Sequence, residues 1–543
     1  MPSQPPSKES KTEAPAAGGP LRLGNFLCFL MPSVADLLFA VLLFGLSAGA
    51  LGRLLLRDAD TGWHIRNGQR ILLTHAIPRV DSFSATMSGK PWYAWEWLWD
   101  LGMAVIHQVM GLNGVVFYSA AIIAATFALA LYLATDRGAN LLVTLFLLVL
   151  ALGASAVHFL ARPHVVSWLL TVIWFQLLDS SLMARDCIDR KRLYWLPLIM
   201  LLWANLHGGF LIGFALLGAY ASGFFIEYFS RPEQQTRAAQ ILRQIGLPTL
   251  LCILASLVNP YGYRLHVHVW KYLSDRFLMN SISEFHSPNF HGAAQECFAL
   301  LILITIVAVA SAHKKAHPAH VLVLLFAIYS GLFATRNLPV SSLLIVLILA
   351  PLLSETISGV VEGKSAEWMK STCARLNGFG SRMQSIDLRL SGHLWLVAAF
   401  VVGLWACAHS GRVGSEQVIN AYFDPKKFPV EAVDALAQRQ RTENKIFEPI
   451  YSLDSWGGYL IYRQYPAQKV FIDDRHDFYG DAYIKDYIKV TLAQPGWDEV
   501  LNDLHANLVL IPAGSSLASV MRLSPDWKTT HEDQAAILFQ RID

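Results

Sequence analysis

The chain has 543 residues, of which 54% are hydrophobic and only 15% are charged. Soluble domains carry roughly 25% charged residues, so this composition predicts a polytopic membrane protein. The formal net charge of +3, without a basic arm, argues against a nucleic-acid-binding protein. The six cysteines form no CxxC pair, which argues against a structural zinc site or a disulfide framework.

About eleven apolar runs approach the roughly 20 residues that a membrane-spanning helix needs. A polar segment, residues 1–32, precedes them and is expected to be a disordered cytoplasmic tail. Residues 33–409 then form a predicted, mainly α-helical membrane domain. The predicted spans are 33–56, 112–134, 139–157, 164–183, 192–206, 208–229, 243–259, 296–312, 319–335, 338–354 and 391–409.

The loops between these spans predict the orientation of the chain. If the N-terminus is cytoplasmic, every inner loop is basic, as the positive-inside rule requires. These loops contain Arg137, the segments 185–192 and 231–243, Lys314–Lys315 and the segment 364–389. The first outer loop, 57–111, and the C-terminal region, 410–543, are therefore expected on the outer side.

Both outer regions contain predicted secondary structure. In the first outer loop, apolar residues at helical spacing over 65–75 and 95–109 predict two helices along the membrane interface. The region 410–543 alternates between strand and helix patterns, which predicts a small soluble α/β domain. Its predicted strands are 459–462, 469–472, 508–511 and 536–540, and its predicted helices lie near 429–439 and 497–507.

Unusual polar residues gather at the outer ends of the spans. They include Asp58, Asp60, His64, Arg162, His164, His207, Arg336 and Asn337. Taken singly, each has a structural explanation, such as a solvated helix end, a turn or an interfacial anchor. Because several helix ends supply them to the same side of the membrane, we interpret them as one shared outer site.

Other classes of protein fit the sequence less well. No charged residue lies near the centre of a span, where a coupled transporter usually places one. The GxSxG, P-loop and HExxH motifs are absent, so hydrolase, NTPase and metalloprotease functions have no support. A non-catalytic membrane subunit whose outer domain binds a partner or an envelope polymer stays open as an alternative, and a lipid or polysaccharide transporter as a third.

The chain resembles the GT-C superfamily of integral-membrane glycosyltransferases. The resemblance covers about 33–354 and consists of many spans, a large first outer loop and an Asp-x-Asp pair, Asp58-Ala59-Asp60, just after the first span. Asp58-x-Asp60-x-x-Trp63-His64, Ser455–Leu460 and Val470–Arg475 also resemble segments of bacterial members. This implies an integral protein of the bacterial inner membrane, with the domain 410–543 in the periplasm.

The resemblance also implies an activity. Such enzymes transfer a sugar from a polyprenyl-phosphate donor in the lipid phase to an outer acceptor, here an unidentified glycan, lipid or protein. Asp58 or Asp60 would be the general base, with inversion at the anomeric carbon. Arg162, His164 and Arg336 would bind the donor phosphate.

Further residues complete the predicted site. His64, Glu96, His207 and Asn337 are additional candidates for substrate binding, and a divalent cation, Mg or Mn, on the carboxylates stays an open alternative. In the C-terminal domain, Asp473, Asp474 and Arg475 form a polar cluster that either ends a strand or contacts the acceptor.

Overall fold

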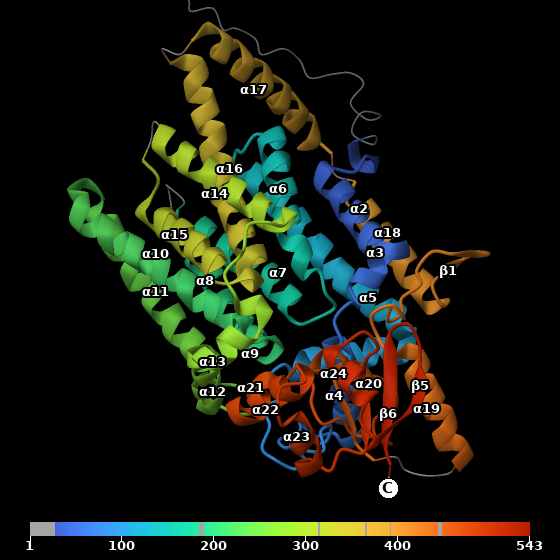
Figure 1. Cartoon of the computed structure of the whole chain (residues 1–543). Coiled ribbons are helices and arrows are strands. Elements are labelled where there is room, and N and C mark those ends of the chain that lie inside the picture. Colours follow the sequence, from blue (N-terminus) through green and yellow to red (C-terminus); the bar gives the residue numbers. More distant parts are fainter. Residues whose placement is uncertain are drawn as a thin grey trace, which may run out of the picture.

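The computed structural model describes residues 28–183, 189–312, 315–363, 366–390, 392–443 and 448–542. A helical bundle occupies most of the molecule, with the C-terminal domain at one end and helix α17 (Glu367–Asp387) at the other (Figure 1). This architecture confirms the predicted fold class, a mainly α membrane bundle with a small α/β domain. The predicted tail lies outside the described residues except for 28–32.

Each predicted span coincides with a helix. Among the described residues, eight helices are long and apolar enough to cross a membrane, so the protein is an integral membrane protein. The helices at the predicted spans are α2 (Val34–Ser47), α5 (Trp97–Asp136), α6 (Leu141–Ser155), α7 (His164–Leu182), α9 (Trp195–Leu206), α10 (Leu211–Ser230), α11 (Gln235–Ser256), α14 (Ala293–Ser311), α15 (Pro318–Phe333), α16 (Leu338–Glu362) and α18 (Leu394–Ala408).

Two glycines change the predicted helix boundaries. The first predicted span is divided, because α2 ends at Ser47, Gly49 has φ +57°, and a short helix α3 (Gly49–Leu54) follows. The predicted interfacial helix 95–109 and the second span instead form the single 40-residue α5, with a kink at Gly111 (φ 60°). Glycine adopts positive φ without steric penalty, so it fits both the boundary between α2 and α3 and the kink inside α5.

Helix α4 (Asp60–Thr74) connects the membrane domain to the C-terminal domain. It packs against α5 and against α20 (Asp454–Gln464), and most of its first half is buried. Its position along the membrane interface stays a prediction. Gly62 faces the backbone oxygen of Gly458 in α20, and Gly68 faces that of Asp100 in α5. A Cβ atom would lie 2.3 Å and 1.9 Å from these oxygens, so both contacts require glycine.

We therefore expect Gly68→Ala to destabilise the protein by about 1–3 kcal/mol, the usual cost of overpacking a close contact. The measurement is thermal unfolding of the purified protein in detergent. Gly102→Ala in α5 is the matched control, because a Cβ atom there meets nothing within 4 Å. Equal melting temperatures for the two variants would contradict the close α4–α5 packing.

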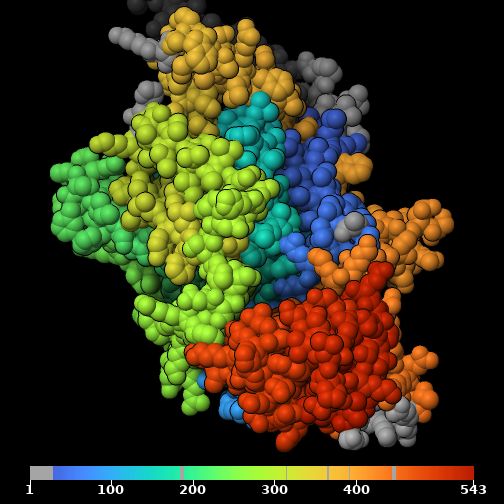
Figure 2. Space-filling model, in the orientation of Figure 1, coloured from blue at the N-terminus to red at the C-terminus, as the bar shows by residue number. Residues whose placement is uncertain are grey.

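Shorter elements surround these helices. The short helices α12 (Tyr263–Ser274) and α13 (Arg276–Ser281) lie beside the C-terminal domain in Figure 2. The remaining short elements are α8 (Arg190–Leu193), the single turns Ala156–His158, Gly208–Phe210, Pro232–Gln234, Ser283–Phe285 and Thr335–Asn337, and the hairpin β1 (Arg412–Val413) and β2 (Glu416–Gln417).

The C-terminal domain contains a four-stranded sheet with the order β3-β4-β6-β5. Strand β3 is parallel to β4, and the other pairs are antiparallel, with Ile450 opposite Leu508 and Val509 opposite Phe539. The elements are β3 (Ile450–Ser452), β4 (Leu508–Pro512), β5 (Trp527–Glu532), β6 (Ala536–Arg541), α19 (Val430–Glu443), α20, α21 (His476–Tyr479), α22 (Asp481–Thr491), α23 (Trp497–Asp503) and α24 (Ser516–Met521).

The predicted strands at 508–511 and 536–540 and both predicted helices are present, whereas the strand at 459–462 is wrong. This segment lies in α20, where Trp456, Tyr459 and Leu460 recur at helical spacing and are buried. The predicted strand at 469–472 is also wrong, because only Val470 in this segment forms bridges, to Ser84 and Ile450.

Candidate active site

A cavity of about 780 Å³ opens where the bundle meets the C-terminal domain. All of the predicted site residues except His64 and Asp473 line it. The membrane domain contributes residues from the α4 and α7 N-termini, the α9–α10 break and the start of α16, and the C-terminal domain contributes Asp454 and the segment Asp474–Asp477. The structure therefore collects helix ends that are far apart in the sequence around one space.

Asp58 and Asp60 are held together at the start of α4 by Arg162. The guanidinium donates from Nη1 to Asp58 Oδ2 at 2.8 Å and pairs through Nη2 with Asp60 Oδ2 at 2.7 Å. Asp58 Oδ1 accepts the backbone N–H of Asp60, and Asp60 Oδ1 accepts the indole N–H of Trp63. Asp58 keeps more exposure than Asp60, with 21% against 4% of the side chain.

Burial raises the pKa of the Asp60 carboxyl, and Arg162 opposes this effect. A carboxylate with a raised pKa is a stronger base, while the more exposed Asp58 is easier for a substrate to reach. The geometry is thus compatible with either aspartate as the base.

A second arginine, Arg336, lines the same cavity. It pairs with Glu284, with Nη1 at 3.3 Å from Oε1, and its guanidinium stacks over Phe285. Burial alone would raise the pKa of Glu284, but Arg336 and Arg162 lower it to about 2. The cavity therefore combines two guanidinium groups with the ionised carboxylate of Glu284. A phosphate could take the place of this carboxylate as the anionic partner of Arg336.

The histidines have different positions. His64 is buried behind the cavity wall, and Glu96 lies between the Nε2 atoms of His64 and His207, at 3.8 Å and 3.6 Å. His164 lines the cavity and contacts the backbone oxygen of His158 through Nε2 at 2.8 Å. Asn337 donates from its side-chain amide to the backbone oxygen of Ser330.

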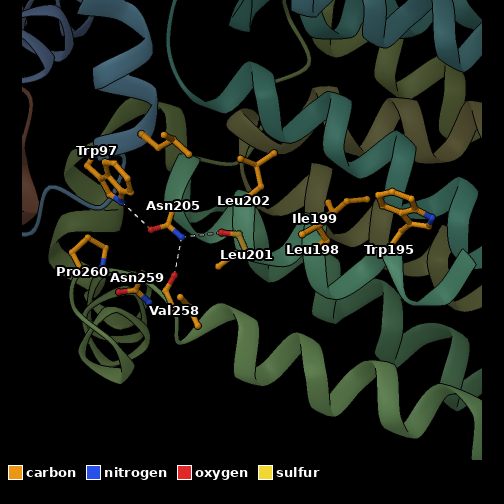
Figure 3. A pocket seen from close by; sticks show the side chains of 11 residues that line it. Trp97, Trp195, Leu198, Ile199, Leu201, Leu202, Asn205, Val258, Asn259 and Pro260 are labelled. Atoms are coloured by element: carbon orange, nitrogen blue, oxygen red, sulfur yellow. Dashed lines mark hydrogen bonds between the residues drawn. The ribbon is translucent and has the colours of Figure 1, made fainter.

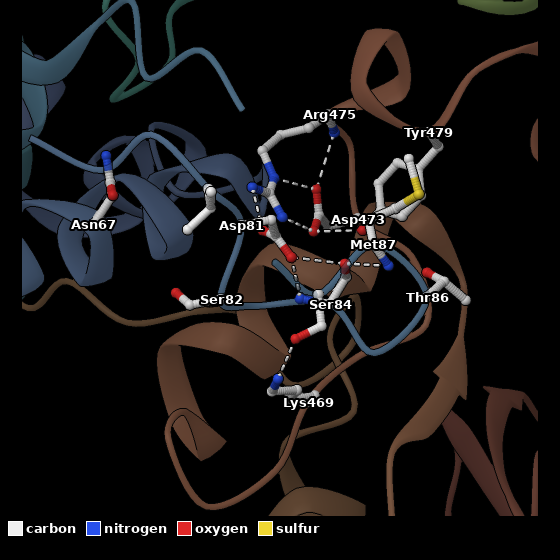
Figure 4. A network of polar contacts seen from close by, with 12 residues as sticks. Asn67, Asp81, Ser82, Ser84, Thr86, Met87, Lys469, Asp473, Arg475 and Tyr479 are labelled. Carbon is white, nitrogen blue, oxygen red and sulfur yellow. Dashed lines mark hydrogen bonds and ion pairs between the residues drawn. The ribbon is translucent and has the colours of Figure 1, made fainter. Parts of the chain in front are cut away.

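A buried polar network anchors the C-terminal domain beside the cavity (Figure 4). Arg475 donates from Nε and Nη2 to both oxygens of Asp473 at 2.7 Å, and its Nη1 lies 2.8 Å from Asp81 Oδ1 in the first outer loop. Tyr479 donates its hydroxyl to Asp473, and Asp81 accepts the hydroxyl of Ser84. Asp473 and Arg475 thus join the outer loop to the C-terminal domain.

Asp474 is directed differently from its neighbours and comes close to the α4 carboxylates. Asp58, Asp60 and Asp474 each offer an oxygen within 4.8 Å of the others, and Asp454, Asp474 and His476 form a second such group. Burial, followed by Asp60, Asp454 and Asp58, raises the pKa of Asp474 well above its usual range. A divalent cation would relieve this crowding of carboxylates, and oxygen donors suit Mg or Mn.

We expect millimolar Mn²⁺ to raise the melting temperature of the wild-type protein, and Asp474→Asn to lose most of that increase. A ligand at 100 times its Kd stabilises a protein by about 2.7 kcal/mol. Asp477→Asn is the control, because Asp477 lines the same cavity, pairs with His268 at 3.2 Å and belongs to neither group. An undiminished response in Asp474→Asn would exclude this cation site.

A second, largely apolar groove of about 760 Å³ lies along α9 (Figure 3). Trp97, Trp195, Leu198 and Leu202 line it, with Asn205 at one end. The Asn205 side chain accepts the indole N–H of Trp97 and donates to the backbone oxygens of Leu201 and Val258. These bonds hold the helix break that precedes His207.

Sequence reasoning did not select several residues that the structure places at this site, namely Glu284, Asp100, Asp454 and His476. Glu284 belongs to the polar outer ends of the chain, and Asp454 directly precedes the Ser455–Leu460 segment. Asp100 lies one helical turn after Glu96, a spacing that could have indicated a shared face.

No protein-family model matches the chain, and no curated protein matches its sequence. Among solved structures, the archaeal oligosaccharyltransferase AglB from Archaeoglobus fulgidus, in complex with an inhibitory peptide and a dolichol-phosphate, matches with TM-score 0.54 and 10% identity, over 90% of this chain and 69% of that one. The apo form of the Archaeoglobus fulgidus oligosaccharyltransferase matches with TM-score 0.53 and 9% identity, over 90% of this chain and 70% of that one. ArnT from Cupriavidus metallidurans, bound to undecaprenyl phosphate, matches with TM-score 0.49 and 12% identity, over 94% of this chain and 98% of that one.

At these identities, the likeness to AglB shows a shared fold alone. The chain thus has the fold of AglB, a GT-C fold.

Proposed function

We propose that the protein is a membrane glycosyltransferase that moves a sugar from a polyprenyl-phosphate donor to an acceptor on the outer side of the membrane. The observation that carries this proposal is the single cavity that combines Asp58 and Asp60 with Arg162 and Arg336 at the end of the spanning helices. The fold shared with AglB, whose structure contains a dolichol-phosphate, supports the same substrate class.

In this proposal, the donor phosphate binds between Arg162 and Arg336, with His164, His207 and Asn337 completing the wall. Both guanidinium groups stabilise the charge that develops on the departing phosphate. Apolar side chains of the same cavity would receive the first prenyl units, namely Leu211, Ile212, Phe333 and Val340. The donor thus keeps its chain in lipid while its phosphate reaches the polar end.

Asp58 or Asp60 would accept the proton of the acceptor hydroxyl as that oxygen attacks the anomeric carbon. Attack on the face opposite the phosphate inverts the anomeric configuration. A cation on Asp58, Asp60 and Asp474 would supply further positive charge at this position. The acceptor would enter beside the C-terminal domain, where Asp474 and Arg475 line the cavity.

We also propose that the cavity and the C-terminal domain face the periplasm of a bacterial inner membrane, with the N-terminus in the cytoplasm. The basic loops support this orientation, since α17, which carries Arg375 and Arg382, lies at the end of the bundle opposite the C-terminal domain (Figure 1). The end of α5, which precedes Arg137, contacts α17 there through the bond from Gln384 to the backbone oxygen of Thr135.

The test is sugar transfer by the purified protein in lipid nanodiscs. A panel of undecaprenyl-phosphate sugars is supplied with an envelope extract as acceptor, and release of undecaprenyl phosphate is measured by mass spectrometry. We expect release from at least one donor, and only when acceptor is present. A folded protein that turns over none of the panel would contradict the proposal.

A further inference from the structure

Glu96 lies in the cavity between the imidazole rings of His64 and His207. The other contacts of these rings indicate which of their nitrogens carry protons. Its Oε1 lies 3.6 Å from His207 Nε2, and its Oε2 lies 3.8 Å from His64 Nε2. The carboxyl is mostly buried, with 12% of the side chain exposed to the cavity. Contacts slightly longer than hydrogen bonds are common at catalytic groups before a substrate binds.

The tautomer of His207 follows from its other nitrogen. The backbone N–H of Gly209 donates to His207 Nδ1 at 3.0 Å, and a backbone N–H is only a donor. Nδ1 therefore carries no proton. In the neutral ring, the proton is on Nε2, which donates toward Glu96. The Ser167 hydroxyl accepts the indole N–H of Trp203 at 2.7 Å and lies 2.8 Å from the same Nδ1. Its own hydrogen can therefore be donated to Nδ1, which agrees with an unprotonated Nδ1.

His64 contacts a carboxyl group on each side. Its Nδ1 lies 2.5 Å from Asp100 Oδ1, and its Nε2 faces Glu96. A neutral imidazole has one N–H. With that N–H on Nδ1, His64 donates to Asp100 at hydrogen-bond distance, and its Nε2 is left as an acceptor that faces the Glu96 carboxyl at 3.8 Å. Asp100 also accepts the side-chain amide of Asn67 at 2.6 Å. In this tautomer, Asp100 holds the His64 ring so that an acceptor nitrogen faces Glu96, an arrangement that suits a protonated Glu96 carboxyl.

We propose that Glu96 donates a proton to the phosphate that leaves the donor sugar, and that Asp100, acting through His64, is a positioning residue that keeps this proton available. The inference rests on the proposed function, because it assigns a role within the same transfer. An ionised Glu96 would repel a phosphate held by Arg162 and Arg336, whereas a protonated one donates a hydrogen bond to it.

The step balances as follows. The bond between the anomeric carbon and the phosphate oxygen breaks, and its electron pair stays on that oxygen. The acceptor oxygen bonds to the anomeric carbon and gives its proton to Asp58 or Asp60. The carboxyl proton of Glu96 passes to a phosphate oxygen, and the ionised Glu96 accepts the N–H of His207 until water returns a proton.

The charges around Glu96 agree with this role. Burial raises its pKa to about 7, His64 lowers it, Asp100 raises it, and Arg162 and Arg336 lower it. Burial lowers the pKa of His64 to about 4 and that of His207 to about 3, so both rings are neutral. Glu96 is therefore partly protonated at neutral pH and loses its proton as the pH rises through about 7.

Infrared difference spectroscopy of the ligand-free protein tests the protonation directly. We expect the wild-type protein to show a protonated-carboxyl band that disappears as the pH rises through about 7, and Glu96→Gln to lack it. Glu284→Gln is the matched control, since Glu284 lies in the same cavity but is ionised. Asp100→Asn should move the midpoint to lower pH, a shift that a purely structural role would not produce. No Glu96-dependent band near neutral pH would overturn the inference.

The second measurement is the pH dependence of undecaprenyl phosphate binding. Above pH 7, the affinity of the wild-type protein and of Glu284→Gln should decline with pH more steeply than that of Glu96→Gln, by up to about tenfold per pH unit. The reason is that Glu96 loses its proton in this range, whereas the glutamine of Glu96→Gln keeps an N–H donor at every pH. Binding with the same pH dependence in all three would overturn the inference alone. No binding by any of them would overturn the proposed function and the phosphate role together.

Discussion

Replacing Asp58 and Asp60 together by asparagine is expected to reduce sugar transfer by at least about 100-fold, because the cavity then lacks its proposed general base. Asparagine has nearly the same shape and still accepts hydrogen bonds from Arg162, so the protein should remain folded. The measurement is the release of undecaprenyl phosphate from the donor that the wild-type protein uses. The melting temperature, measured in parallel, checks the fold.

The single variants identify the base. Asp58→Asn and Asp60→Asn are expected to differ, with the larger loss in kcat at the residue that accepts the proton. The other residue, which only holds Arg162, should mainly raise KM because Arg162 binds the donor phosphate. Asp477→Asn is the control on the same cavity wall. Unchanged turnover in both single variants and in the double variant would remove the assignment of the base to this pair.

Replacing Arg475 by methionine is expected to destabilise the protein by about 3–5 kcal/mol, because it leaves Asp81 and Asp473 buried without a cation. Neither carboxylate is exposed, and Arg475 is 5% exposed. Its guanidinium also lies 4.6 Å from the centre of the Trp92 ring, a contact that is lost as well. The measurement is thermal unfolding, together with limited proteolysis at the junction of the C-terminal domain.

The control for Arg475→Met is Arg522→Met, which breaks the exposed pair with Glu532 and should cost less than about 1 kcal/mol. Adding Asp81→Asn and Asp473→Asn to Arg475→Met should restore part of the stability, since no uncompensated charge then remains. Equal effects of the two single variants would show that the network in Figure 4 contributes no more than a surface pair.

The membrane part was predictable from sequence because each apolar run needs about 20 residues to span the bilayer. The boundaries were less predictable. Gly49 and Gly111 interrupt the helical segments through their positive φ angles. The apolar pattern of the sequence around each glycine gives no sign of the interruption. The segment 459–462 was misassigned because a short apolar run fits both a strand and a helix, and the contact of α20 with α4 decides between them.

The charges of the loops predict that the site lies on the outer side, and the cavity contains the predicted site residues apart from His64 and Asp473. Their partners could not be deduced. The bridge from Arg162 to Asp58 and Asp60 spans about a hundred positions of the chain, and the pairing of Arg475 with Asp81 spans nearly four hundred. The first contact depends on how the start of α7 lies against the start of α4, and the second on how the C-terminal domain packs on the 57–111 loop. No local sequence pattern contains either arrangement.

The central claim, that the cavity is the donor site, is tested most directly by a cryo-EM structure of the protein in nanodiscs with undecaprenyl phosphate. The account predicts density for the phosphate between Arg162 and Arg336, within reach of Glu96, and prenyl density along Leu211 and Phe333. Lipid phosphate bound elsewhere, with this cavity free of it, would contradict the account.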